Sequence, residues 1–285
     1  MNKTIRNIII VALFTVGGGW LGIWLNNVTG NIQPPMQSLG ALVWLITPAF
    51  SGIFLRAFGG DGWQDAGFRL NLVSGWKWYL VAILVYPLAT LLTFGLATLI
   101  DAISVDGFAT QGFNAYLSAV GIMTAGSLMK NIFEEFAWRG YLTPRLEAAK
   151  VPALLNHLIV GVLWWAWHLP YYYYFLDRAQ LNTYLGNINI PIFLVLALFS
   201  SLLTAILFGE LRLLGKSVWT VFILHNIING LSMPLILNGF IERNGWAGII
   251  LSPTNDGIIM SILLGVAGVF LYQYRERKIA NGNKK

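Results

Sequence analysis

The stretch S-L-M-K-N-I-F-E-E-F-A-W-R-G-Y-L, residues 127–142, has the composition of a membrane-spanning helix but contains two adjacent acids and a base. The acids are Glu134 and Glu135, and Arg139 follows one turn later. An ionised group at the centre of a bilayer costs about 2.5–3.5 kcal/mol on insertion scales. The chain has only 12 acidic residues and places two of them here, so we infer that they serve a function.

The composition of the chain indicates a polytopic membrane protein. Of the 285 residues, 56% are hydrophobic and 11% charged, and the mean hydropathy is +0.66. Soluble domains average about 25% charged residues. The net charge of +6 could suggest a nucleic-acid partner. However, the basic residues lie in short loops and at the C-terminus, so we expect the lipid bilayer as partner and no nucleic acid. The absence of cysteine excludes disulfides and a thiol nucleophile.

About eight apolar stretches are long enough to cross a hydrocarbon core of about 30 Å. The sequence therefore predicts an all-α transmembrane bundle, a single domain over residues 1–274, followed by a basic, disordered tail over residues 275–285. The predicted spans are Ile5–Leu25, Leu39–Phe58, Trp76–Ile100, Tyr116–Tyr141, Ala153–Tyr173, Ile190–Phe208, Val218–Leu237 and Gly257–Tyr274.

The basic residues predict the orientation of these spans. With both termini in the cytoplasm, 14 of the 18 Lys and Arg residues fall in cytoplasmic segments, and only Arg178 and Arg243 fall in outer loops. The remaining two, Lys130 and Arg139, lie within the fourth span. This asymmetry follows the positive-inside rule. The glycine-rich segment of residues 59–70 then becomes a cytoplasmic turn or a short interfacial helix.

Helical geometry separates the roles of the two glutamates. Adjacent residues on a helix point about 100° apart, so Glu134 and Glu135 cannot share a face. Glu135 and Arg139 are spaced i, i+4 and can form an ion pair. Glu134 is left facing a neighbouring span. Lys130, one turn before it, could pair with an acid or extend toward the outer surface, and we favour a structural role for it.

Two other predicted spans contain polar residues that could meet Glu134. The fifth contains W-W-A-W-H-L-P, where His168 follows Trp164 by one turn. The seventh contains H-N-I-I-N, which places His225 and Asn229 on one helix face. Such residues also act as structural hydrogen-bonding partners between membrane helices. We interpret Trp164 as core packing and His157 as interfacial.

This set of residues can support hydrolysis. A buried carboxylate can act as general base on a water molecule. Two imidazoles and a carboxylate, here His168, His225 and Glu134, could instead hold Zn²⁺ or another divalent metal with an open position. Asn229 could donate to a developing oxyanion. The chain lacks both the G-x-S-x-G serine elbow and the H-E-x-x-H zinc motif.

Depth along the helices tests whether these groups can meet. Glu134 lies roughly 16 Å below the cytoplasmic surface, and His225 with Asn229 lies about 10–16 Å below it, on a rise of 1.5 Å per residue. His168 comes out deeper, at about 22 Å. The contact between Glu134 and His168 therefore disagrees with this estimate.

The three segments resemble the ordered motifs of the CPBP family of intramembrane proteases, also called the CAAX-processing and bacteriocin-processing, or Abi, family. The matching residues are E-E-F-A-W-R (134–139), W-W-A-W-H (164–168) and H-N-I-I-N (225–229). The resemblance covers the core over residues 127–231, and the flanking segments are similar to those of bacterial members. Trp164 departs from the family pattern, which usually has Phe there, so the width of the pocket is in question.

The resemblance implies an eight-helix fold in a bacterial cell membrane, with an active site that opens toward the cytoplasm. It implies that Glu134 activates water beside His168, while His225 and Asn229 stabilise an oxyanion or support a metal. Glu135 and Arg139 would shape the site. The implied partner is a membrane protein or lipidated peptide that is cut as substrate. Two alternatives stay open: a non-catalytic scaffold or bacteriocin-immunity protein, and an ion-coupled transporter.

Overall fold

The computed structural model describes residues 2–30, 34–186 and 188–282, and these residues form a helical bundle. Its long helices are α1 (Lys3–Thr29), α2 (Leu39–Ala57), α3 (Leu72–Leu99), α5 (Phe113–Ala137), α7 (Ala153–Pro170), α9 (Ile190–Gly215), α10 (Val218–Leu237) and α12 (Ile258–Gly282). The short elements are η1 (Pro35–Gln37), β1 (Ile103–Ser104), α4 (Asp106–Gln111), η2 (Trp138–Leu142), α6 (Thr143–Ala148), η3 (Tyr171–Phe175), α8 (Arg178–Leu185), β2 (Glu242–Arg243) and α11 (Gly245–Ile250).

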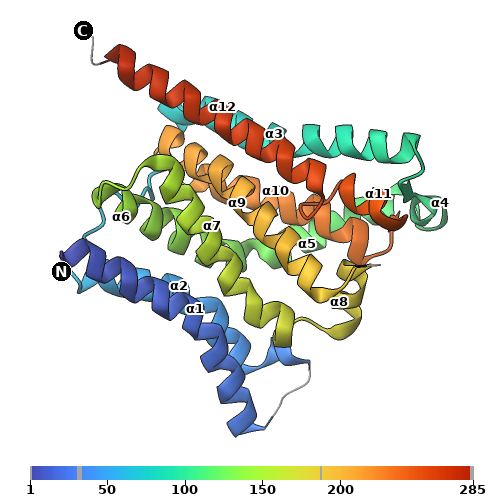
Figure 1. The fold of residues 1–285 in the computed structure, drawn as a ribbon, viewed down its shortest axis with the longest axis horizontal. Helices are drawn as coiled ribbons and strands as arrows, with labels where there is room; N and C mark the ends of the chain where they lie inside the picture. The colour runs from blue at the N-terminus through green and yellow to red at the C-terminus, as the bar shows by residue number, and fades with distance from the viewer. Residues whose placement is uncertain (1, 31–33, 187, 283–285) are drawn as a thin grey trace.

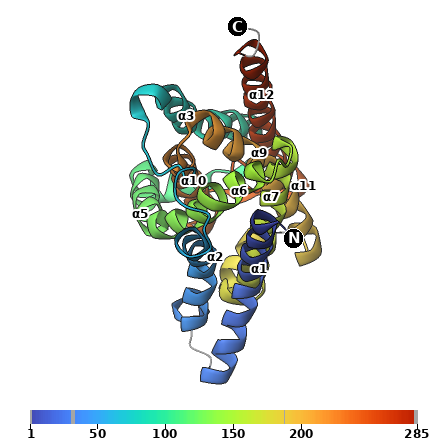
Figure 2. The same ribbon diagram turned by 90° about the vertical axis from the view of Figure 1, so that its left-hand side faces the viewer.

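The long helices are arranged around α5, α7, α9 and α10. The α1–α2 hairpin packs against one side of this group, and α3 with α12 packs against the other (Figure 1). Both termini lie at the same end of the bundle, and α4, α8 and α11 lie at the opposite end. Figure 2, viewed from the end with the termini, shows the α1–α2 hairpin and α12 projecting in opposite directions. The order of helices therefore places both termini on one side, as the predicted topology requires.

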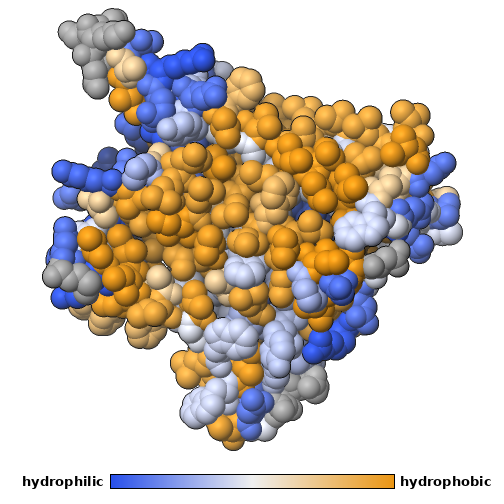
Figure 3. Space-filling model, viewed as in Figure 1, coloured by the Kyte–Doolittle hydropathy of each residue, from blue (hydrophilic) through white to orange (hydrophobic). Residues whose placement is uncertain are grey.

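The surface agrees with a membrane environment. On the face shown in Figure 3, apolar side chains form a broad band across the middle of the molecule, and hydrophilic residues gather at its two ends. Among the described residues, six helices are long and apolar enough to cross a membrane: α1, α2, α3, α9, α10 and α12. The other two predicted spans correspond to α5 and α7, which are less apolar because they contain the charged and polar motifs. The chain is an all-α, multi-pass bundle, as predicted.

Several details differ from the sequence prediction. The outer loops contain three short helices and a two-stranded antiparallel ladder of β1 and β2, whereas residues 59–70 form turns, which is one of the two predicted alternatives. The predicted tail continues α12 as far as Gly282, while residues 283–285 lie outside the described residues. These segments are too short or too polar for hydrophobic periodicity to detect.

Glycines bring α1 and α2 into direct backbone contact. A Cβ atom on Gly22 would lie 2.3 Å from the carbonyl oxygen of Gly40, and one on Gly40 would lie 2.1 Å from that of Gly22. Next to this contact, the side chain of Asn26 accepts from the amide of Gly40 and donates to the Ser38 hydroxyl. Small residues allow this close approach of membrane helices.

Two tryptophans join the hairpin to the centre of the bundle. The indole N–H of Trp44 donates to the carbonyl of Trp167 at 2.8 Å, and the indole of Trp167 donates to the carbonyl of Trp44 at 3.1 Å. Their rings stack with centroids 4.4 Å apart, and both side chains are fully buried. Since α7 also carries Trp164 and His168, this paired contact holds their helix in place.

We expect Trp44→Phe to destabilise the protein by about 1–3 kcal/mol, because it leaves the buried carbonyl of Trp167 without its donor. Thermal unfolding in detergent would show a lower midpoint. The control is Trp24→Phe, because the Trp24 side chain is 58% exposed on the same hairpin. Equal midpoints for the two variants would contradict the role given to this hydrogen bond.

Candidate active site

Glu135 and Arg139 form the predicted ion pair at the junction of α5 and η2. One Arg139 nitrogen (Nη1) lies 3.2 Å from a Glu135 carboxylate oxygen, and both side chains are completely buried. The guanidinium lies over the neighbouring rings of Trp164 and Phe208, and each ring centroid is 4.7 Å from its central carbon. A desolvated cation over an aromatic ring gains about 2 kcal/mol. The positive charge of Arg139 is thus balanced by one carboxylate and two rings.

His225 contacts Glu135 rather than Glu134. Its Nδ1 lies 2.7 Å from the Glu135 carboxylate, so this nitrogen donates a proton and leaves Nε2 as the free position of the ring. From the sequence we expected His225 to face Glu134. The prediction of a direct contact between them is wrong, although His225 lies close enough to interact with Glu134 electrostatically.

Glu134 has two partners, Trp164, which was not predicted to contact it, and Lys130, for which pairing with an acid was one of the two alternatives. The indole N–H of Trp164 donates to one carboxylate oxygen at 2.7 Å, and Lys130 forms an ion pair with the other. Trp164 therefore does more than pack the core, and Lys130 takes the acid-pairing alternative. As helical geometry predicts, Glu134 and Glu135 face different helices: Glu134 faces α7, whereas Glu135 faces α10.

His168 lies near Glu134 in the structure, since it follows Trp164, the hydrogen-bond partner of Glu134, by one turn on α7 and lines the same cavity as Lys130. Its Nδ1 lies 2.9 Å from the carbonyl oxygen of Trp164. A carbonyl can only accept, so Nδ1 carries the proton and Nε2 is free, as in His225.

Asn229 pairs with a residue that the sequence analysis missed. Its side-chain amide donates to the Asn131 oxygen at 3.0 Å, which joins α10 to α5. The Asn131 amide nitrogen is buried and has no hydrogen-bond partner among the described residues. Asn131 lies one turn before Glu134 and Glu135 on α5. Its spacing on α5 is enough to place Asn131 beside Glu134 and Glu135. However, a single Asn in a membrane helix does not by itself indicate a functional site.

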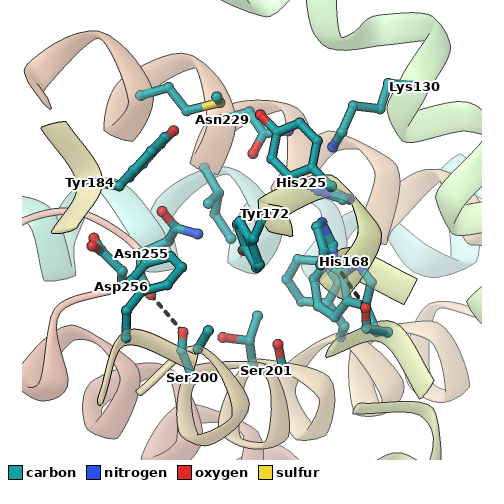
Figure 4. Close-up of a pocket in the computed structure, with 18 residues that line it drawn as sticks. Lys130, His168, Tyr172, Tyr184, Ser200, Ser201, His225, Asn229, Asn255 and Asp256 are labelled. Carbon is teal, nitrogen blue, oxygen red and sulfur yellow. Dashed lines mark hydrogen bonds between the residues drawn. The ribbon is translucent and has the colours of Figure 1, made fainter. Parts of the chain in front are cut away.

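The polar residues border one internal cavity of about 140 Å³. That volume is large enough for several water molecules. His168, His225 and Lys130 line one side of it, and Tyr184, Asn255 and Asp256 line the opposite side (Figure 4). Ser200 and Ser201 of α9 complete its floor in this view. The cavity thus gathers the two histidines, Asn229 and the two partners of Glu134, Lys130 and Trp164.

The side of the cavity opposite the histidines is formed by η3, α8 and the loop before α12. These elements lie at the end of the bundle opposite the termini. In the predicted orientation this is the outer end, whereas the family resemblance implies a site open to the cytoplasm. At the end of the bundle with the termini, which is cytoplasmic in the predicted orientation, residues 59–70 pack against η2 and the end of α5. The residues Tyr172, Tyr184, Ser200, Asn255 and Asp256 were not predicted, since single polar residues on separate elements form no pattern in sequence.

The expected metal ligands are not arranged as a donor set. Among the described residues, no group of three or more His, Asp or Glu side chains is placed to hold a metal ion. Both oxygens of the Glu134 carboxylate are bound, by Lys130 and Trp164, so neither is available as a metal ligand beside the histidines. These residues do not fit a metal in this arrangement.

A π-helical turn, η2, directly follows the end of α5 that carries Glu134 and Glu135. The amide of Thr143 donates to the carbonyl of Trp138, five residues earlier, which is the π-helical spacing. Arginines from other helices bind the carbonyl oxygens inside this turn. Arg212 of α9 donates through Nε to the carbonyl of Arg139 at 2.9 Å, and Arg56 of α2 donates to that of Gly140. The backbone next to the Glu135–Arg139 pair is therefore held from two sides.

The segment of residues 59–70 is fixed onto this turn. Asp61 accepts from the Tyr141 hydroxyl at 2.6 Å and from the Asn7 amide at 3.1 Å. Asp65 forms ion pairs with Arg56 and Arg145. Although this segment resembles a surface loop in composition, its charges fix it over η2, and we call residues 59–70 the cytoplasmic cover because they lie on the cytoplasmic side in the predicted orientation.

The comparison with known families agrees with the motifs. Residues 116–231 match the family model described as "Type II CAAX prenyl endopeptidase Rce1-like". This match confirms the resemblance to the CAAX-processing protease family, and it covers α5, α7, α9 and most of α10. It indicates an integral membrane endopeptidase of the CAAX protease type. No curated protein sequence matches the chain significantly.

We expect Arg56→Gln to loosen the cytoplasmic cover, because the buried carbonyl of Gly140 and the Asp65 carboxylate both lose a charged donor. Hydrogen–deuterium exchange should become faster in the peptides covering residues 59–70 and 138–142. Arg69→Gln is the matched control, since Arg69 is exposed in the same segment and has no side-chain partner among the described residues. Unchanged exchange in Arg56→Gln would contradict the proposed clamp.

Proposed function

We propose that the protein hydrolyses a peptide bond in a hydrophobic or lipidated membrane-associated substrate, using water activated by Glu134. One observation carries the proposal: the two residues that hold the buried Glu134 carboxylate, Trp164 and Lys130, line a cavity large enough for several water molecules, and two imidazoles line the same cavity. A scaffold needs no such acid in the membrane interior. The family resemblance supports peptide hydrolysis as the reaction and a bacterial cell membrane as the location.

Glu134 is suited to act as general base. A water molecule in the cavity would transfer a proton to the Glu134 carboxylate while its oxygen attacks the carbonyl carbon of the substrate. The same proton would then pass to the leaving amine nitrogen, so that the carboxylate is regenerated. Trp164 keeps the carboxylate in place, and Lys130 supplies the balancing positive charge.

The histidines and asparagines are placed to stabilise the oxyanion. Because Nδ1 of His168 and of His225 is already engaged, Nε2 is the atom that each ring can present to water or substrate. A protonated Nε2 would donate to a negatively charged oxygen. The free amide N–H groups of the Asn131–Asn229 pair are a second set of donors beside Glu134.

The lining of the cavity supports an apolar substrate. Its aromatic members are Trp164, Tyr171, Tyr172, Tyr184, Phe193 and Phe208. Aromatic walls favour an apolar chain, while the serines and amides can bind the peptide backbone.

Water activated by Glu134 alone needs no metal, and the arrangement of the described residues supports this form of the proposal. The zinc-assisted form predicts that a chelator abolishes cleavage and that added metal restores it. The metal-free form predicts that cleavage survives chelation, with no stoichiometric metal in the purified protein.

Glu134→Gln should abolish cleavage of a membrane peptide, a loss of at least 1,000-fold, while leaving the protein folded. The Gln side chain can still accept from Trp164 but cannot take a proton from water. Cleavage is measured by mass spectrometry of products in proteoliposomes. Glu147→Gln is the matched control, because Glu147 is exposed on α6, distant from the cavity. Cleavage by Glu134→Gln at the normal rate would contradict the assignment and favour another catalytic group.

Replacing Trp164 separates the role of its N–H group from that of its ring. Trp164→Phe removes the donor to Glu134 but keeps a ring over Arg139, so we expect a loss of about tenfold, corresponding to one hydrogen bond of about 1.5 kcal/mol. Trp164→Ala also uncovers Arg139, and we expect a loss of 100-fold or more. Equal rates for the two variants would show that the ring contributes nothing to positioning.

A further inference from the structure

We infer that the end of the bundle carrying the termini contains a binding site for the phosphate headgroup of an anionic lipid. A second cavity, of about 580 Å³, lies between α6, α9, α12 and residues 64–67, separate from the candidate active site. Four basic residues line it: Arg212, Lys216, Arg275 and Lys278. The inference is independent of the proposed hydrolysis.

The cavity has an excess of positive charge that the protein does not neutralise. Its two acids are Asp65, which is already paired with Arg56 and Arg145, and Glu147. Arg275 is neutralised by Glu210, with Nε 2.6 Å from the carboxylate. Lys216 and Lys278 are exposed, and their ammonium groups have no hydrogen-bond or ion-pair partner among the described residues. Basic pockets between membrane helices on the cytoplasmic side are suited to anionic headgroups.

The shape of the cavity fits a lipid better than a soluble anion. The basic side chains share the lining with Pro144, Leu213, Leu214 and Ile279, which offer an apolar wall for the glycerol and the first acyl carbons. Hydrophilic side chains gather around the end of α12, next to the apolar band (Figure 3). The cavity therefore lies where headgroups and chains meet, on the side that is cytoplasmic in the predicted orientation.

Arg212 connects this cavity with the active-site backbone. The side chain is buried, its Nη2 donates to the carbonyl of Asp65 at 2.6 Å, and its Nε donates to that of Arg139. A phosphate held by Lys216 and Lys278 beside Arg212 would favour the arrangement in which this guanidinium binds both carbonyls. A bound lipid would then stabilise the cytoplasmic cover of the site.

The test compares two double variants with the same loss of charge. In Lys216→Gln/Lys278→Gln the cavity loses both free ammonium groups. In Arg69→Gln/Lys77→Gln the same end of the bundle loses two exposed positive charges outside the cavity. Each protein is placed in nanodiscs containing dioleoylphosphatidylglycerol or only dioleoylphosphatidylcholine. Retained lipid is counted by native mass spectrometry, and the thermal midpoint is measured in parallel.

We expect the unchanged protein and the Arg69/Lys77 variant to retain phosphatidylglycerol and to unfold several degrees higher with it. The Lys216/Lys278 variant should retain at least tenfold less and lose the thermal shift. Equal retention of phosphatidylglycerol by both variants would overturn the site. An equal loss in both variants would also overturn it, because such a loss indicates general attraction to an anionic surface. An equal thermal shift from millimolar glycerol 3-phosphate in phosphatidylcholine nanodiscs would overturn the lipid as ligand.

Discussion

The completely buried guanidinium of Arg139 sets the condition that the rest of the site satisfies. A charge that is removed from water must be balanced locally, because an unpaired ion in a low-dielectric interior is strongly unfavourable. Glu135 supplies the opposite charge, and the adjacent rings of Trp164 and Phe208 both contact the cation. His225 binds the same carboxylate from α10. Helices α5, α7, α9 and α10 must therefore converge at this residue.

The π-helical turn gives this central pair a connection to the surface. Within η2 the carbonyl oxygens of Arg139 and Gly140 are bound by arginines from α9 and α2. Those arginines also bind the backbone or carboxylate of residues 59–70. A displacement of the cytoplasmic cover is thus transmitted to the backbone that carries Arg139. π-Helical turns occur often at functional sites, and here the turn joins the Glu135–Arg139 pair to residues 59–70.

The sequence predicted those features that depend on helical spacing. The eight long helices, the Glu135–Arg139 ion pair and the opposite directions of Glu134 and Glu135 all follow from length, hydropathy and the angle between adjacent residues. It did not predict which group across the bundle each acid would meet. His225 could satisfy either carboxylate from its position on α10, and only the packing of α10 against α5 selects Glu135.

Three other features could not be predicted from the sequence, because each depends on a contact between residues that are far apart in the chain. The π-helical turn depends on arginines 73 or more residues away in the chain. The Asn131–Asn229 pair joins two residues that are individually unremarkable. The indole donor of Trp164 was overlooked because the residue reads as bulky and apolar, and only its contact with Glu134 gives the departure from the family pattern a chemical meaning.

The two groups that hold Glu134 differ in how easily they can be displaced. Trp164 is buried among aromatic rings, and moving it would expose Arg139. Lys130 has 31% of its side chain exposed, and its long, flexible stem allows the ammonium group to move within the cavity. A carboxylate that accepts a proton from water needs one oxygen free. Under the proposed mechanism, Lys130 is therefore the partner that gives way to water, while Trp164 keeps the orientation of the carboxylate fixed.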